Sequence, residues 1–185
     1  MRGGILRQAF ATALAVAGTC ADAGAGATHV QEFPMGARGS IYIEVDDAWV
    51  DSSSRGGPIP TLRFETKTPG RMKVMITPVP TVDGRAPASE EVRVFVESAA
   101  GERRAEAVEK ALPLTAMRGA ETNGFRFRAT DRSPKPGEYR FLHQGAVAAG
   151  AFFVTFTVLF NDAGEEDARK ALSAIQNIRV ASKRI

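Results

Sequence analysis

Residues 151–160 read AFFVTFTVLF, which is the most apolar stretch of the chain after its first two dozen residues. In an extended chain, successive side chains point to opposite faces. Phe153 and Leu159 therefore fall on one face, and five more apolar side chains fall on the other: Phe152, Val154, Phe156, Val158 and Phe160. A strand that is apolar on both faces is typical of the centre of a sheet that is covered on both sides.

The segment after this strand predicts the clearest helix of the chain. Asp162 is a candidate N-cap, and the acidic run 165–167 suits the positive end of a helix dipole. An apolar stripe then recurs at helical spacing: Ala168, Ala171, Leu172, Ile175 and Ile178. We expect this stripe to pack against the sheet.

Alternating segments before the central strand predict further strands. Residues 139–147 lead into it through a connection near Gly150, and Asn123-Gly124 is a hairpin-type turn signal. After that turn, apolar side chains alternate with Arg126 and Arg128. Three earlier segments show the same alternation: 41–45, 62–65 and 72–77.

Between these strands, residues 89–99 predict a second helix. Ser89 is a candidate N-cap, and four apolar residues share one helical face: Val92, Phe95, Val96 and Ala99. The order is strands, a helix, antiparallel strands and a terminal helix. This order favours an α+β fold with an antiparallel β-sheet packed between helices, in one domain over residues 39–185.

Residues 1–23 have the three-part order of a secretory signal peptide. Arg2 and Arg7 precede a short apolar run, and small residues follow, with Ala21-Asp22-Ala23 as a cleavage site. The apolar run is shorter than the about 20 residues that a transmembrane helix needs. We therefore expect an exported protein, periplasmic or secreted, with no transmembrane span in the mature chain.

Cys20 is the only cysteine of the chain. A bacterial lipoprotein places a small residue directly before the lipidated cysteine, whereas Thr19 stands here, so a lipid anchor fits poorly. Residues 24–38 are rich in Gly and Ala at their start and show no periodicity, which predicts a flexible lead.

Three features together resemble the PsbP/Mog1-like domains. They are the segment IYIEVDDAW at 41–49, the strand entry at Asn123-Gly124-Phe125, and the run FTVLFND at 156–162 with the terminal helix 165–178 after it. The resemblance covers roughly residues 40–180. It implies an α/β/α sandwich and a non-enzymatic accessory or binding domain, and it implies no particular binding residues.

The residue pattern does not match the common catalytic and metal sites. His29 and His143 are the only histidines, and no G-x-S-x-G elbow is present. The run GAVAAG at 145–150 lacks the Lys-Ser/Thr of a phosphate-binding loop, and neither 46–47 nor 165–167 has the spacing of a calcium loop. We predict a non-enzyme with no cofactor.

Three arginines are candidates for binding an anionic partner. Arg126 and Arg128 project from one face of a predicted strand, and Arg140 is expected on the neighbouring strand, although a solvated sheet face would have the same pattern. Trp49 is a candidate ligand or partner contact, or else a lid on the core. The formal net charge of +3 on 185 residues is too small to indicate a nucleic-acid binder.

These features favour an accessory or binding domain that acts on a protein complex in the cell envelope. The expected partner is a protein, with an anionic lipid or a small molecule as alternatives. A small-molecule or lipid-binding periplasmic carrier and an unrecognised hydrolase are the other functions that the sequence leaves open.

Overall fold

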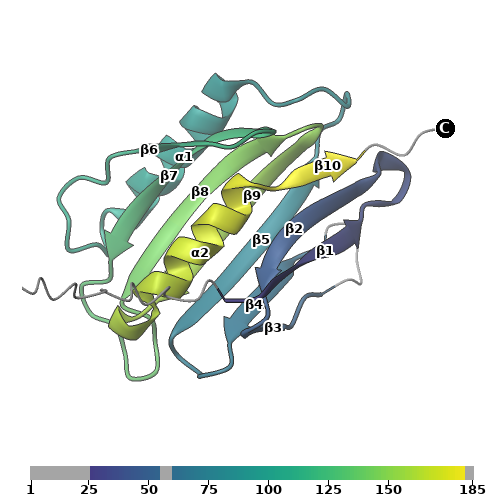
Figure 1. Cartoon of the computed structure of the whole chain (residues 1–185). Helices are drawn as coiled ribbons and strands as arrows, with labels where there is room; N and C mark the ends of the chain where they lie inside the picture. The colour runs from purple at the N-terminus through teal and green to yellow at the C-terminus, as the bar shows by residue number, and fades with distance from the viewer. Residues whose placement is uncertain (1–25, 55–59, 182–185) are drawn as a thin grey trace, which may run out of the picture.

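The computed structural model describes residues 26–54 and 60–181, which form two antiparallel sheets and two helices (Figure 1). The predicted signal peptide and Cys20 lie outside the described residues. The larger sheet has the order β3-β4-β5-β9-β8-β7-β6. Its strands are β3 (Trp49–Asp51), β4 (Leu62–Thr66), β5 (Met72–Pro80), β6 (Thr115–Arg118), β7 (Thr122–Thr130), β8 (Phe141–Ala149) and β9 (Phe152–Phe160).

The smaller sheet joins segments from the two ends of the described chain. Its order is β1-β2-β10, and its strands are β1 (Thr28–Pro34), β2 (Ser40–Asp46) and β10 (Arg179–Ala181). The helices are α1 (Ser89–Arg103) and α2 (Glu165–Gln176), with short 3-10 turns at Gly36–Arg38 and Asp162–Gly164. In this part of the chain, neither helix is both long enough and apolar enough to cross a bilayer.

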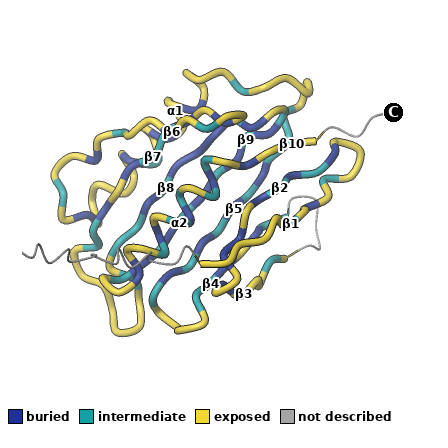
Figure 2. The backbone as a smooth tube through the Cα atoms, in the orientation of Figure 1, coloured by how far each residue is buried: buried dark blue, intermediate teal, exposed yellow. Residues whose placement is uncertain are grey.

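The prediction that residues 151–160 form the central strand of the sheet is confirmed by β9. All nine residues of β9 pair with β5 on one side and with β8 on the other. The face that carries Phe152, Phe156 and Phe160 belongs to a core shared with α2 and the smaller sheet. Phe153, on the opposite face, packs with the core under α1. Figure 2 shows the buried residues concentrated along these central strands.

The expected α/β/α sandwich is wrong. The structure is mostly β, with 46% of the described residues in strands and 22% in helices. The reason lies on the α2 side of the larger sheet, where β1, β2 and β10 form a second sheet. Ile41, Ile43 and Val45 of β2 are buried in the same core as α2, so a sheet and a helix together cover this face instead of a helical layer.

The segment expected to be a flexible lead contains strand β1. Residues 28–34 pair with β2 over seven positions, from Thr28 opposite Asp46 to Pro34 opposite Ser40. Only Phe33 of this strand is buried, so its sequence carries no alternation of apolar and polar residues. An edge strand of this kind is held mainly by its backbone ladder, which the side-chain pattern does not reveal.

The Asn123-Gly124 pair lies inside β7 and does not form a turn. Gly124 pairs with Val147 of β8, and Gly145 pairs with Arg126. An added Cβ at Gly145 would lie 2.3 Å from the backbone oxygen of Phe125, so the two strands approach more closely than a larger residue allows. Both glycines therefore serve the close approach of β7 to β8.

Replacing Gly145 by alanine is expected to lower the free energy of unfolding by about 1–3 kcal/mol, because the new methyl group must displace neighbouring backbone. Urea denaturation measures this change. Gly101→Ala is the matched control, because Gly101 lies in α1 with open space around it and gains helix propensity. If both substitutions have the same effect, the close approach does not constrain the sheet.

Candidate functional site

Strand β7 holds two of the predicted arginines on one face of the larger sheet. Phe127 points to the core under α1, so Arg126 and Arg128 point to the opposite side, the side of α2. The register sets His143 of β8 opposite Arg128 and Gly145 opposite Arg126. The guanidinium of Arg126 therefore meets no side chain directly across the strand pair, and it can lean toward His143.

Arg126 is a half-buried cation without a carboxylate partner in residues 26–54 and 60–181. Its Nη1 donates a hydrogen bond of 2.9 Å to Nδ1 of His143. Burial, and after it the charge of Arg128, lower the pKa of Arg126. Burial and the neighbouring positive charge both disfavour the charged form of Arg126, whereas an anion beside it would stabilise that form.

His143 is buried, with 5% of its surface exposed. Burial lowers its pKa to about 4, with further contributions from the charges of Arg126 and Arg128, while a hydrogen bond with the backbone of Phe127 acts in the opposite direction. The imidazole is therefore neutral near pH 7, and its Nδ1 accepts the hydrogen bond from Arg126. Its ring stacks on Phe160, with 5.3 Å between the centroids.

Arg128 is exposed and forms a bidentate ion pair with Glu165 in the first turn of α2. Its Nη1 and Nη2 donate to the carboxylate of Glu165 at 3.3 and 2.9 Å. The guanidinium also lies over two rings, 5.2 Å from the centroid of Phe141 and 5.4 Å from that of Phe160. These contacts fix the direction of a side chain that would otherwise be mobile at the surface.

Arg140 is the residue immediately before β8, and its side chain reaches the same aromatic rings. Its guanidinium lies 5.4 Å from the centroid of Phe141, which stacks on Phe160. The structure thus brings together all three predicted arginines around one row of rings, which we call the arginine cluster: Arg126, Arg128, Arg140, Phe141, His143 and Phe160. Within residues 26–54 and 60–181, Glu165 is the one carboxylate that pairs with an arginine of this cluster.

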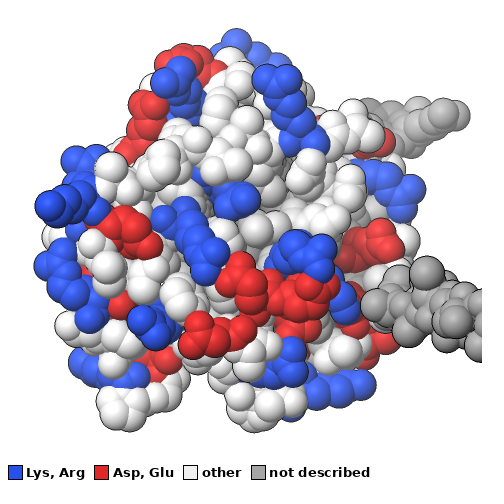
Figure 3. All heavy atoms as spheres, turned by 60° about the vertical axis from the view of Figure 1, so that its left-hand side comes forward, with Lys and Arg blue, Asp and Glu red and all other residues white. Residues whose placement is uncertain are grey.

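The charges on the β6 and β7 side of the molecule do not form a continuous patch of one sign. Figure 3 turns the β6 and β7 side of the molecule forward and shows Lys and Arg interleaved with Asp and Glu. A long polyanion needs a stripe of positive charge. The mixed surface favours recognition of a single anionic group.

Sequence reasoning missed the contribution of three residues of this site. It considered His143 only as a candidate for catalytic or metal sites, and it did not connect Phe160 or Glu165 to the arginines. The alternation within β7 and β8 was readable, but the register between them was not, and the register decides that His143 faces Arg128. The contact with Glu165 depends in addition on how α2 lies over the sheet.

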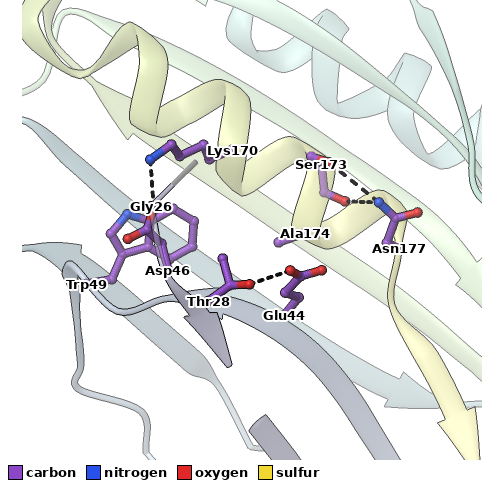
Figure 4. A pocket seen from close by; sticks show the side chains of 9 residues that line it. All are labelled: Gly26, Thr28, Glu44, Asp46, Trp49, Lys170, Ser173, Ala174 and Asn177. Atoms are coloured by element: carbon purple, nitrogen blue, oxygen red, sulfur yellow. Dashed lines mark hydrogen bonds and ion pairs between the residues drawn. The ribbon is translucent and has the colours of Figure 1, made fainter. Parts of the chain in front are cut away.

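Trp49, the other candidate residue, belongs to both the core and a cavity. It begins β3, is 8% exposed, and packs on Phe64 with 6.3 Å between the ring centroids. Its Nε1 is buried and has no hydrogen-bond partner in the described part of the chain. The indole also lines a cavity of about 210 Å³ between α2 and β2 (Figure 4).

Other site types find no support in the residues that the structure describes. Among them, no group of three His, Cys, Asp or Glu side chains could hold a metal ion. His143 has its Nδ1 engaged by Arg126 and its ring against Phe160, and in the described part of the chain it forms no hydrogen bond with a serine or a carboxylate, as a hydrolase triad requires.

Comparison with known proteins gives no family for this chain. No protein-family model matches it, and no curated protein matches it significantly. The resemblance to PsbP/Mog1-like domains stays a prediction, and the function is argued below from the geometry of the arginine cluster.

Proposed function

We propose that the chain is a non-enzymatic, exported binding domain that serves as an accessory of a protein complex in the cell envelope. It would hold a carboxylate of its protein partner at the arginine cluster. The observation that carries the proposal is the half-buried guanidinium of Arg126, whose one hydrogen bond to the described chain goes to a neutral imidazole.

The chemistry of Arg126 suits a carboxylate. A guanidinium has five N–H donors in a planar fork, and one of its nitrogens is engaged by His143. The remaining donors can bind both oxygens of a carboxylate, and such charge-assisted pairs are about twice as strong as neutral hydrogen bonds. Burial strengthens the attraction, because the effective dielectric constant is lower than in water.

Two neighbours of Arg126 favour the same ligand. Arg128 places a second guanidinium on the same face, where Glu165 pairs with it. Thr115 of β6 lies opposite Arg126 in the ladder and is exposed, so its hydroxyl is available to a bound oxygen. An acidic side chain of a partner could thus meet two arginines and a hydroxyl.

Arg126→Gln is expected to weaken partner capture at least tenfold, because truncating one member of a buried charge pair costs about 2–5 kcal/mol. The test is a pull-down of the mature domain from envelope extract, quantified by mass spectrometry, followed by a binding titration with the isolated partner. Arg63→Gln is the matched control, since Arg63 is an exposed arginine on β4 outside the cluster.

The two variants separate the outcomes of this experiment. A stoichiometric protein that is lost with Arg126→Gln and kept with Arg63→Gln supports the proposal. A partner that both variants retain places the interface elsewhere. A co-purifying lipid or metabolite with no protein partner would favour the carrier function instead.

A further inference from the structure

The cavity beside Trp49 is separate from the arginine cluster and has a different chemistry. It lies between α2 and the β1–β2 pair, with Thr28, Glu44 and Asp46 on the sheet side. Figure 4 shows these side chains facing Lys170 and Ser173 of α2. The rest of the wall comes from Gly26, Trp49, Ala174 and Asn177.

Two of its charges compensate each other. Nζ of Lys170 lies 2.7 Å from the carboxylate of Asp46, which is 5% exposed. Burial acts to raise the pKa of Asp46, but hydrogen bonds from Lys170 and from the backbone N–H of Ala48 outweigh it, and the pKa is lowered. Asp46 is thus ionised and paired, and this pair ties β2 to α2.

Glu44 is then the uncompensated charge of the cavity. Its Oε1 accepts a hydrogen bond of 2.5 Å from Oγ1 of Thr28, and its other oxygen accepts none in the described part of the chain. No cation of residues 26–54 or 60–181 lies within ion-pair distance of it. The lining therefore carries one net negative charge, from Glu44 and Asp46 against Lys170.

The remaining wall is apolar at one end and polar at the other. The indole of Trp49 closes the end near Asp46, and Ala174 adds an apolar side. Glu44 and Asn177 also line a neighbouring cavity of about 170 Å³, so a molecule held at Glu44 has room on both sides. The volume of about 210 Å³ is below the roughly 300–1,000 Å³ of sites for drug-sized ligands.

We infer that this cavity binds a small organic ammonium compound. The ammonium group donates to the free oxygen of Glu44, and the apolar part of the molecule lies against Ala174 and Trp49. A carboxylate without an ion-pair partner attracts an organic ammonium group by a charge-assisted hydrogen bond, and the apolar wall accommodates the hydrocarbon part of the molecule. An anion of the same size is repelled by Glu44, and a neutral molecule gains no ion pair there.

Trp49 provides the measurement, because it is the only tryptophan of the chain. The full chain without its signal peptide is titrated with n-butylammonium, and with 1-butanol and butyrate as a neutral and an anionic analogue. We expect a saturable change in tryptophan fluorescence with the ammonium compound, with a Kd on the order of 1 mM, an affinity reasonable for so few heavy atoms. An equal response to 1-butanol would overturn the inference.

Glu44→Gln is expected to weaken the binding of n-butylammonium at least tenfold. Glu32→Gln is the matched control, because Glu32 lies on the adjacent strand and lines neither cavity. Circular dichroism verifies that both variants are folded. If Glu44→Gln binds as well as the unmodified protein, Glu44 does not hold the ligand and the inference fails. Arg126→Gln is expected to leave this binding unchanged, so the test is independent of the proposed function.

Discussion

Replacing Phe160 by alanine is expected to lower the free energy of unfolding by about 3–5 kcal/mol, the range for a fully buried phenylalanine. Phe160 ends the central strand and has no exposed surface. Its ring stacks on Phe141 and His143 and lies under the guanidinium of Arg128. The substitution therefore removes core volume and the support of the arginine cluster at once.

Urea denaturation at pH 7, followed by circular dichroism, measures this loss of stability. Phe95→Ala is the matched control, because Phe95 is 45% exposed on α1 and packs on Phe153. We expect a loss of about 1 kcal/mol or less for this variant, since little core volume is removed. A similar loss for both variants would show that β9 is not the centre of the core.

His143 is expected to make the protein less stable by about 3 kcal/mol as the pH falls from 7 to 4. The pKa of an unfolded histidine is near 6.5, and burial lowers that of His143 to about 4. The unfolded state then binds the proton more readily than the folded state. The contribution of His143 is complete above pH 6.5 and is lost as the pH falls through the window between the two values.

The measurement is the free energy of unfolding in urea at several pH values between 7 and 4, for the unmodified protein and for His143→Gln. Glutamine does not titrate and can still accept the hydrogen bond from Arg126. The carboxylates titrate alike in both proteins, so the difference between the two curves isolates His143. Parallel curves would mean that His143 is accessible to protons in the folded state, against its burial.

The two stability experiments also bear on the arginine cluster. Protonated His143 can no longer accept at Nδ1, and its charge would lie beside those of Arg126 and Arg128. The orientation of Arg126 thus depends on a neutral histidine. A carboxylate ligand is therefore expected to bind more weakly below pH 4 than at pH 7. Protonation of the ligand carboxylate itself acts in the same direction.

The sequence by itself determined the elements with strong periodicity. The alternation in residues 151–160 identified the central strand, and the apolar stripe after residue 165 identified α2. It also predicted that Arg126 and Arg128 share a face, because the side-chain period of a strand is two. On α1 the pattern was less precise, since Phe95, expected on the buried face, is 45% exposed.

Only the tertiary structure decided what covers the sheet and what meets at the site. Strand β1 has one buried residue, Phe33, and exists because its backbone pairs with β2. The contact of Arg126 with His143 depends on the register of β7 with β8, and the pairing of Lys170 with Asp46 joins residues far apart in the chain. Periodicity reports how each segment divides its own side chains between two faces, whereas pairing and register arise from contacts between segments, which no local pattern contains.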